Sequence, residues 1–311
     1  MTSDSPLRRR GLLKAGAVLS IAGLAPAVTA ARATAAPAAG SAAASGPRRA
    51  TDALRALEER YSARLGVHAR NTRTGQSVAY RAGERFALCS TFKVFAAGAV
   101  LRDHASSAPL DKVVRYPDRD ILLNSPVTQQ HVGSGMTVGE LCAAAIRHSD
   151  NCAGNLLLRE LGGPAGLTAF FRSLGDRVSR LDRWEPDLNS AGPGELRDST
   201  TPQALGASLE RLTVGDELSG AAREQLLTWL KGNTTSARRF RAGLPKDWVV
   251  GDKTGTGDYA SANDIGVAWT TRGTPLVLVV LTSRDAPDAA VDEGLIADAA
   301  AVLADTLAPG E

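Results

Sequence analysis

The order of strand-like and helix-like segments is the strongest constraint on how this 311-residue chain folds. Strand patterns occur near both ends. Two of them, at 67–70 and 77–80, flank a turn sequence typical of a hairpin. Three more follow at 248–251, 264–270 and 276–282. Because the segments between the two groups have helical periodicity, the order predicts that the chain ends share one antiparallel sheet of about five strands.

Helical spacing of apolar residues defines the remaining elements. A first helix is expected over 51–65, ended by Gly66, and a last helix over about 293–307. Besides the apolar run at 94–101, five helices are expected between the strand groups, at 138–146, 153–161, 166–174, 202–212 and 221–230. The prediction is a two-lobed α/β fold of the α+β type. A sheet lobe (51–87 and 233–311) carries the terminal helices, an all-helical lobe covers 88–232, and a ligand site is expected in the cleft between them.

The N-terminal residues have the composition of an export signal. A run of three arginines at 8–10 precedes an apolar stretch at 11–27 and Ala-Thr-Ala at 33–35. The paired arginines predict a twin-arginine signal over 1–35, and a general secretory signal is the alternative. A transmembrane anchor is disfavoured because the apolar stretch is short and contains Pro26. We therefore expect a secreted, periplasmic or cell-envelope protein.

Removing the signal changes what the charge implies about partners. Residues 1–35 contain five basic residues and one acidic residue, so the net charge falls from +3 to −1. A near-neutral protein lacks the basic surface that binds nucleic acid or anionic membranes, and we expect neither partner. Residues 36–50 are rich in Ala, Gly and Ser and are expected to form a flexible lead-in to a catalytic domain at 51–311.

The cysteines and histidines do not indicate a metal site. Cys89, Cys142 and Cys152 are an odd number of thiols without metal-ligand spacing, and we interpret all three as small buried apolar residues. The four histidines are scattered along the chain. No metal or cofactor is expected.

A serine and a lysine three residues apart open an apolar run at 94–101. The run predicts a buried helix, in which Lys93 can reach the oxygen of Ser90. An alcohol needs a neighbouring base to become a nucleophile, and this spacing supplies one. The alternative is a capping serine beside a lysine at the surface, which is the commoner meaning of an isolated pair.

Two other short motifs carry hydroxyl, amide and amine groups. Ser149 and Asn151 lie in a turn between two expected helices, where such residues are common for structural reasons alone. Lys253, Thr254 and Thr256 lie in a glycine-containing strand. Glycine weakens a strand, so close approach of another group to its backbone is expected, for example a ligand carboxylate. An ordinary sheet edge is the alternative.

A long irregular segment extends from residue 180 to residue 202. Segments of this length without regular structure inside a compact domain are usually functional. Arg180 and Arg183 near its start and Asp198 near its end are expected to close its neck by ion pairs. Glu185 would then be held firmly enough to orient a water molecule.

Taken together, S-x-x-K, S-D-N and K-T-G in this order, with E-P-x-L-N at 185–189, give the chain a family resemblance. It resembles a class A serine β-lactamase over essentially the whole length from residue 51 to the last helix. The resemblance implies hydrolysis of penicillins and cephalosporins through an acyl-serine intermediate, and hence antibiotic resistance. It also implies small β-lactam substrates as the only partners, no cofactor, and a monomer that is free of the membrane once its signal is removed.

The resemblance also implies roles for individual residues. Ser90 is the nucleophile, and either Lys93 or Glu185 is the base for acylation. Ser149 would protonate the leaving nitrogen, and Glu185 would activate the water for deacylation. Substrate binding is expected from Asn151, Asn189, Lys253, Thr254, Gly255 and Thr256, with Arg241 as a further positive charge, and the oxyanion hole is expected from the backbone N–H groups of Ser90 and Thr256.

Two other activities use the same serine and lysine. A D-alanyl-D-alanine peptidase (a penicillin-binding protein) and a non-hydrolytic β-lactam sensor would not be expected to carry the pair of Glu185 and Asn189. The chain also departs from the family pattern at two positions. Asn124 replaces the usual aromatic residue at the cleft rim, and Gly257 replaces the cysteine to which Cys89 is bonded in some carbapenem-hydrolysing relatives.

Overall fold

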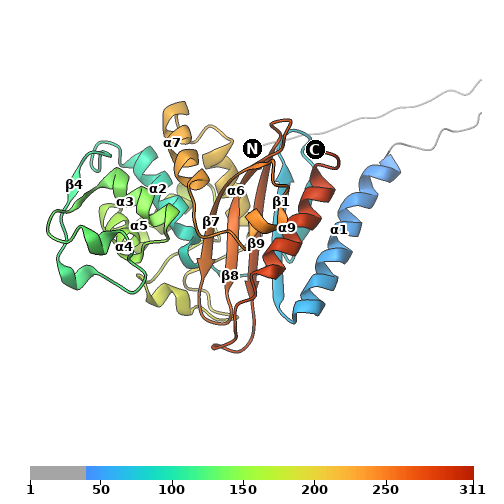
Figure 1. Cartoon of the computed structure of the whole chain (residues 1–311), viewed down its shortest axis with the longest axis horizontal. Coiled ribbons are helices and arrows are strands. Elements are labelled where there is room, and N and C mark those ends of the chain that lie inside the picture. The colour runs from blue at the N-terminus through green and yellow to red at the C-terminus, as the bar shows by residue number, and fades with distance from the viewer. Residues whose placement is uncertain (1–39) are drawn as a thin grey trace, which may run out of the picture. The chain divides into compact units, whose positions relative to one another are not determined.

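A five-stranded antiparallel sheet forms the centre of the fold. The computed structural model describes residues 40–311, so the expected export signal and residues 36–39 lie outside the described residues. The strand order is β2-β1-β9-β8-β7 (Figure 1). The strands are β1 (Arg64–Asn71), β2 (Ser77–Tyr80), β7 (Val249–Thr256), β8 (Ala262–Trp269) and β9 (Pro275–Ser283).

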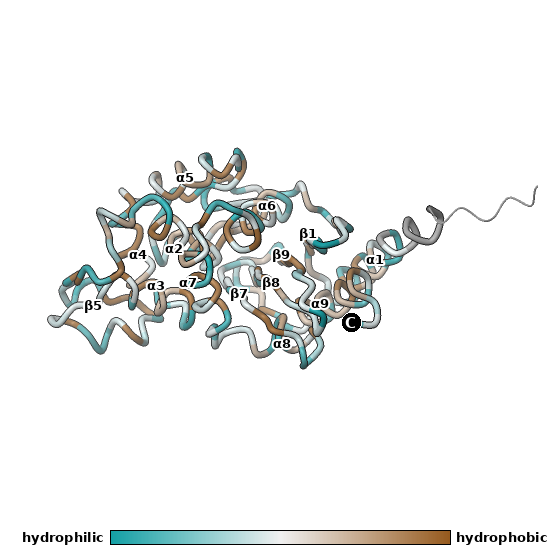
Figure 2. The backbone as a smooth tube through the Cα atoms, turned by 90° about the horizontal axis from the view of Figure 1, so that it is seen from above, coloured by the Kyte–Doolittle hydropathy of each residue, from teal (hydrophilic) through white to brown (hydrophobic). Residues whose placement is uncertain are grey.

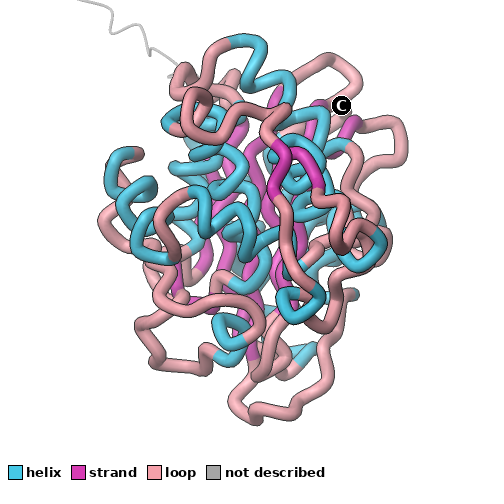
Figure 3. The backbone as a smooth tube through the Cα atoms, turned by 90° about the vertical axis from the view of Figure 1, so that its left-hand side faces the viewer, coloured by secondary structure: helices cyan, strands magenta, loops and turns pink. Residues whose placement is uncertain are grey.

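Strands from the early and the late part of the described residues meet in this sheet, as the order of segments predicts. Strand β1 pairs with β9 over its whole length, with Val67 opposite Val280. Strands β8 and β9 are buried on both faces, which explains their nearly continuous apolar sequence. Figure 3 shows the strands in magenta with helices on both sides. The predicted mixed α/β fold is confirmed.

One face of the sheet is covered by helices α1 (Gly40–Tyr61) and α9 (Gly294–Leu307), which lie side by side in Figures 1 and 2, and by the short α8 (Phe240–Gly243). The bounds of the first helix differ from the prediction. It begins in the expected lead-in, because alanines favour a helix and Ala50 is already buried against this layer. It ends at Tyr61, since Ser62 has a left-handed backbone (φ 48°) and Leu65 belongs to β1.

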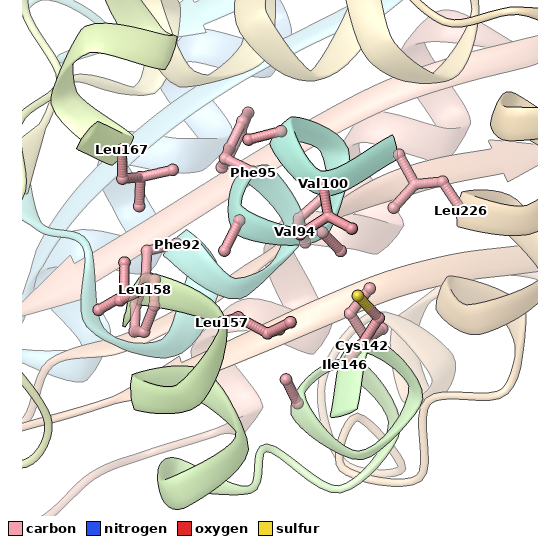
Figure 4. Close-up of a cluster of buried hydrophobic side chains, with 14 of the residues drawn as sticks. Phe92, Val94, Phe95, Val100, Cys142, Ile146, Leu157, Leu158, Leu167 and Leu226 are labelled. Atoms are coloured by element: carbon pink, nitrogen blue, oxygen red, sulfur yellow. The ribbon is translucent and has the colours of Figure 1, made fainter. Parts of the chain in front are cut away.

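The other face is covered by α6 (Pro202–Thr213) and α7 (Gly220–Lys231), and the other helices of the helical region share the hydrophobic core with it. Helix α2 (Phe92–Asp103) runs through the middle of this region, and residues 92–100 are all buried, as predicted for the apolar run (Figure 4). Phe95 packs against Phe171 of α5 with ring centroids 4.8 Å apart. The surrounding helices are α3 (Val138–Arg147), α4 (Asn151–Glu160), α5 (Pro164–Ser173), α6 (Pro202–Thr213) and α7 (Gly220–Lys231).

Two small sheets connect the irregular segments to the rest of the fold. Strand β3 (Phe86–Ala87) pairs with β6 (Ser199–Thr200), which fixes the end of the long loop beside the start of the S-x-x-K motif. Strand β4 (Val113–Val114) pairs with β5 (Met136–Thr137). The three cysteines are buried and unpaired, as predicted. Among the described helices, none is long and apolar enough to cross a bilayer.

Candidate active site

The nucleophile candidate lies where a short 3-10 turn, η1 (Cys89–Thr91), passes into α2. Cys89 has a left-handed backbone (φ 45°), an unfavourable conformation for this residue type that tends to persist at functional sites. Ser90 is 7% exposed, and Lys93 is completely buried. Lys93 Nζ lies 3.0 Å from Ser90 Oγ, so the contact predicted from the three-residue spacing is confirmed.

Lys93 is also held by three groups from two other segments, the S-D-N turn and the long loop. Its Nζ donates to the carbonyl oxygen of Ser149 at 2.9 Å and to Asn151 Oδ1 at 2.8 Å, and it lies 3.0 Å from Glu185 Oε1. Burial lowers the pKa of Lys93, and the Glu185 carboxylate opposes part of that change. An amine with a lowered pKa spends more time uncharged, which a group that accepts a proton requires.

The S-D-N turn places a hydroxyl beside a second buried lysine. Ser149 has a left-handed backbone (φ 56°), and Lys253 Nζ of β7 lies 3.0 Å from its Oγ. Burial lowers the pKa of Lys253 well below its usual value, and the charge of Lys93 lowers it further. The buried Asp150 carboxylate anchors the turn by accepting from the backbone N–H groups of Val127, Thr128 and Ala153.

The neck of the long loop is closed by one of the two expected arginines. Arg183 Nε lies 2.6 Å from Asp198 Oδ2, and the other oxygen of Asp198 accepts from the backbone N–H groups of Asp182 and Arg183. Arg180 pairs with Asp182 instead. Asp198, at the end of the loop, therefore holds the start of the loop in place.

The loop holds Glu185 against the nucleophile. Asn155 of α4 binds its backbone from both sides, accepting from the Glu185 N–H and donating to its carbonyl, and the bond to Pro186 is cis. Ser90 Oγ donates to Glu185 Oε1 at 3.3 Å, and Asn189 Nδ2 donates to the other oxygen. The buried carboxylate is thus oriented by an amide and faces both the serine and Lys93.

The structure explains why the third position of the K-T-G motif is glycine. A Cβ on Gly255 would lie 3.2 Å from the carbonyl oxygen of Leu88 and 3.3 Å from the backbone nitrogen of Ser90. Strand β7 therefore passes directly against the turn that carries the nucleophile. The close approach predicted for this strand exists, and one of the approaching groups is the nucleophile segment itself.

These segments line one cleft. A cavity of about 410 Å³ adjoins a second of about 530 Å³, and both are lined by Asn124, Asn151 and Asn189. The first is also lined by Ser90, His148, Ser149, Thr235, Arg239, Thr254, Gly255, Thr256 and Glu293. No group of side chains in residues 40–311 has the composition and geometry of a metal site.

The assignment of Arg241 to the cleft is wrong. Its guanidinium is paired with Asp252 at 3.0 Å and also donates to the carbonyl of Val250, away from the cleft. Arg239 occupies the expected place. It donates to Thr256 Oγ1 at 2.8 Å and is itself held by Glu293 at 3.0 Å.

Neither Arg239 nor Glu293 could be selected from the sequence. Three arginines occur within residues 238–241, and the four-residue helix α8 begins inside this run. A helix this short gives no apolar periodicity from which the direction of each arginine could be inferred. Glu293 lies far along the chain, directly before α9, and its position carries no motif.

Comparison with known proteins agrees with this geometry. The model of the β-lactamase enzyme family matches residues 49–307. A β-lactamase of Streptomyces lavendulae is 54% identical over 259 residues, which cover 82% of this chain and 85% of that protein. The crystal structure of a β-lactamase from Streptosporangium roseum has a TM-score of 0.82 at 51% identity, covering 84% of this chain and 98% of that one. For the β-lactamase of Streptomyces albus G the TM-score is 0.81 at 52% identity, over 83% and 99%.

Proposed function

This chain belongs to the β-lactamase enzyme family, and we propose that it hydrolyses penicillins and cephalosporins through a covalent acyl-enzyme on Ser90. The observation that carries the proposal is the position of Glu185. Its carboxylate contacts both Ser90 and Lys93 and is oriented by Asn189. A carboxylate placed there can activate water against an acyl-serine ester, a step that a peptidase or a sensor does not need to perform efficiently.

Acylation begins when Ser90 Oγ attacks the lactam carbonyl carbon. Its proton passes to Lys93, 3.0 Å away, or through a water molecule to Glu185. The carbonyl oxygen becomes negatively charged in the tetrahedral intermediate. We assign its stabilisation to the backbone N–H groups of Ser90 and Thr256, a contribution of roughly 3 kcal/mol per donor in comparable enzymes.

Breakage of the carbon–nitrogen bond requires a proton on the departing nitrogen. Ser149 is placed to deliver it, because its hydroxyl lies on the cleft wall and contacts Lys253 at 3.0 Å. The buried Lys253, with its lowered pKa, can pass a proton to Ser149 more readily than an ordinary lysine. The lactam ring is then open: the acyl carbon is esterified to Ser90, the amine stays part of the same molecule, and the Ser90 proton held by the acylation base replaces the one that Ser149 and Lys253 gave up.

The carboxylate of the substrate has a matching group of donors. Lys253, Thr254 and Thr256 lie along β7, and Arg239, the residue directly before α8, donates to Thr256. Both threonines and Arg239 line the cleft. We assign the acylamino side chain of the substrate to Asn151. Since Lys93 already binds the Asn151 oxygen, this residue links the substrate to the catalytic lysine.

Deacylation uses the loop. Glu185 takes a proton from a water molecule positioned with the help of Asn189, and the resulting hydroxide attacks the ester carbonyl. The bond between the acyl carbon and Ser90 Oγ then breaks, and Glu185 gives its proton to Ser90 Oγ, which frees the enzyme and releases the acyl group as a carboxylic acid. Both proton acceptors named here, Lys93 and Glu185, lie within 3.3 Å of the serine oxygen.

Replacement of Glu185 tests this proposal. We expect Glu185→Ala to be acylated by benzylpenicillin but to deacylate at least a hundredfold more slowly, because general-base catalysis contributes about 10²–10⁴-fold. Intact-mass spectra should show a lasting adduct on the variant and only a transient one on the wild-type protein, which should turn over benzylpenicillin and a chromogenic cephalosporin.

Two results would contradict the proposal. Unchanged turnover by Glu185→Ala would remove Glu185 from the mechanism. A long-lived stoichiometric adduct on the wild-type protein would favour a penicillin-binding protein or a sensor. Ser90→Ala, which should form no adduct, is the control that identifies the site of modification.

We also propose where the enzyme acts. The arginines at 8–10, the apolar stretch at 11–27 and the small residues at 33–35 support export, and the paired arginines favour the twin-arginine route. A near-neutral catalytic domain then works outside the cytoplasm as a monomer, with small β-lactams as its partners.

A further inference from the structure

The cleft rim and the S-D-N turn are joined by reciprocal hydrogen bonds that the mechanism above does not use. The side chain of Asn124 donates to the carbonyl oxygen of Ser149 at 3.0 Å. In return, the backbone N–H of Asn151 donates to the carbonyl oxygen of Asn124 at 2.9 Å. The neighbouring Leu123 carbonyl accepts from Asn151 Nδ2 at 3.0 Å. The rim is therefore bonded directly to the turn that carries the proton donor.

The Ser149 carbonyl oxygen is shared by two donors of different kinds. Lys93 Nζ approaches it at 2.9 Å and Asn124 Nδ2 at 3.0 Å. A carbonyl oxygen has two lone pairs and can accept both. Its direction is thus fixed from the rim side as well as from the catalytic side. Rotation of this peptide would move the Ser149 hydroxyl and the lysine contact together.

The backbone conformations of Ser149 and Asn124 explain why a hydrogen bond that holds the Ser149 carbonyl is useful. Ser149 (φ 56°) and Asn124 (φ 62°) are both left-handed. Asparagine tolerates this conformation better than most residues, whereas serine keeps it only when the surroundings hold it there. Asparagine at position 124 meets two needs: it tolerates the left-handed backbone, and its side chain supplies an N–H donor for the Ser149 carbonyl. An aromatic residue at this position would have no side-chain amide to offer.

We propose that Asn124 is a positioning residue for acylation, acting through the Ser149 carbonyl on the Ser149 hydroxyl and Lys93. The inference rests on the proposed function, because it concerns the proton that Ser149 delivers to the departing nitrogen. Glu185 and Asn189 lie on the long loop, and Asn155 holds the Glu185 backbone. Loss of the Asn124 donor therefore slows acylation much more than deacylation, which the Ser149 carbonyl reaches only through the contact between Lys93 and Glu185.

Two substitutions separate the donor from the backbone. Asn124→Gly keeps the left-handed conformation available and removes the side-chain donor. Asn124→Asp keeps the shape and places an acceptor oxygen against the Ser149 carbonyl. The matched control is Gln130→Ala, which removes a side-chain bond from Gln130 to the Pro126 carbonyl (2.6 Å) elsewhere in the same irregular region and outside the cleft.

The measurement is stopped-flow acylation by a chromogenic cephalosporin, followed by decay of the adduct after the excess substrate is removed. We expect about a fivefold slower acylation in Asn124→Gly, the size of one hydrogen bond, and a larger loss in Asn124→Asp. Deacylation in both variants, and both steps in Gln130→Ala, should stay within twofold of wild type.

The outcomes distinguish this inference from the proposed function. Wild-type acylation rates in Asn124→Gly, an equal slowing of both steps, or the same loss in Gln130→Ala would overturn the role of Asn124 alone. Failure of the wild-type protein to form any adduct would overturn the proposed function. Thermal unfolding of each variant shows whether the protein measured is folded.

Discussion

Two arginines of one short run, Arg239 and Arg241, serve different purposes because they face different groups. Arg239 is 4% exposed and faces the cleft, where Thr256 accepts from it. Arg241 faces the interior, where the fully buried Asp252 is its charge partner. The same guanidinium is therefore part of a ligand site at one position and neutralises a buried charge at the other.

This difference predicts that substitution of Arg239 affects substrate binding, whereas substitution of Arg241 affects stability. Arg239→Ala should raise KM for benzylpenicillin about tenfold, since a hydrogen bond between charged groups contributes about 1.5–3 kcal/mol. The preference for benzylpenicillin over its methyl ester, measured as the ratio of kcat/KM values, should fall as well. A general loss of folding would lower kcat/KM for benzylpenicillin and for its methyl ester equally and leave their ratio unchanged.

Arg241→Ala should instead lower the free energy of unfolding by about 3 kcal/mol, at the lower end for a broken buried pair because the arginine side chain is 32% exposed. KM should stay as in the wild type. Urea unfolding together with steady-state kinetics of both variants checks the assignment. A raised KM in Arg241→Ala with unchanged stability would reverse it.

At the scale of elements, strands β7 and β8 carry two carboxyl groups into the interior. Asp252 lies opposite Gly266, and Asp264 lies opposite Thr254, so the two acids share one face of the sheet. Each has one oxygen without a partner among the described residues. Burial raises the pKa of Asp264 well above its usual value, and the nearby Asp252 raises it further. This strand pair therefore holds Asp264 protonated where free aspartate would be ionised.

The raised pKa predicts a pH-dependent stability. Between the ordinary value of about 3.9 and its folded value, Asp264 binds a proton in the folded state and not in the unfolded state. Stability from this group is complete below the ordinary pKa and is lost as pH rises through the folded pKa. Asp264→Asn cannot ionise, and its amide mimics the protonated acid. In urea unfolding, the free energy of unfolding of Asp264→Asn minus that of the wild type should therefore increase from pH 4 to pH 8. Parallel pH profiles of the two proteins would contradict this.

Regular elements were predictable because their cause is local. The hairpin strand at 77–80 and the last strands follow from alternating or continuous apolar residues, and the contact between Ser90 and Lys93 follows from helical spacing. Contacts between distant segments were not predictable in this way. The meeting of Glu185 with Ser90 was inferred from family resemblance, and the bond from Asn124 to Ser149 depends on two left-handed residues that no periodicity reveals.

On the scale of the whole chain, the proposed export signal and the proposed active site are separate in sequence. The residues assigned to catalysis and binding lie within residues 90–293, whereas the proposed signal lies in residues 1–35. Changes in the signal should therefore alter where the enzyme is found without altering its kinetics.

Replacing both Arg9 and Arg10 by lysine keeps the positive charge and removes the arginine pair. We expect hydrolysis of a chromogenic cephalosporin to move from the exported fraction to the cytoplasm of the expressing cells, with unchanged kcat/KM for the purified protein. Continued export would support a general secretory signal. A single replacement, Arg8→Lys, is the control that leaves the pair intact.

The pairing of Arg64 in β1 with Ser283 in β9 has a consequence for how the protein is made. The β1–β2 hairpin leaves the ribosome early, and a lone hairpin is at best marginally stable in water. Its partner strand, β9, is translated only after the whole helical region. The central sheet can therefore close only once β9 has emerged. A translocation machine that accepts only folded proteins would have to wait for this strand, and until then chaperones must protect the apolar face of the nascent hairpin.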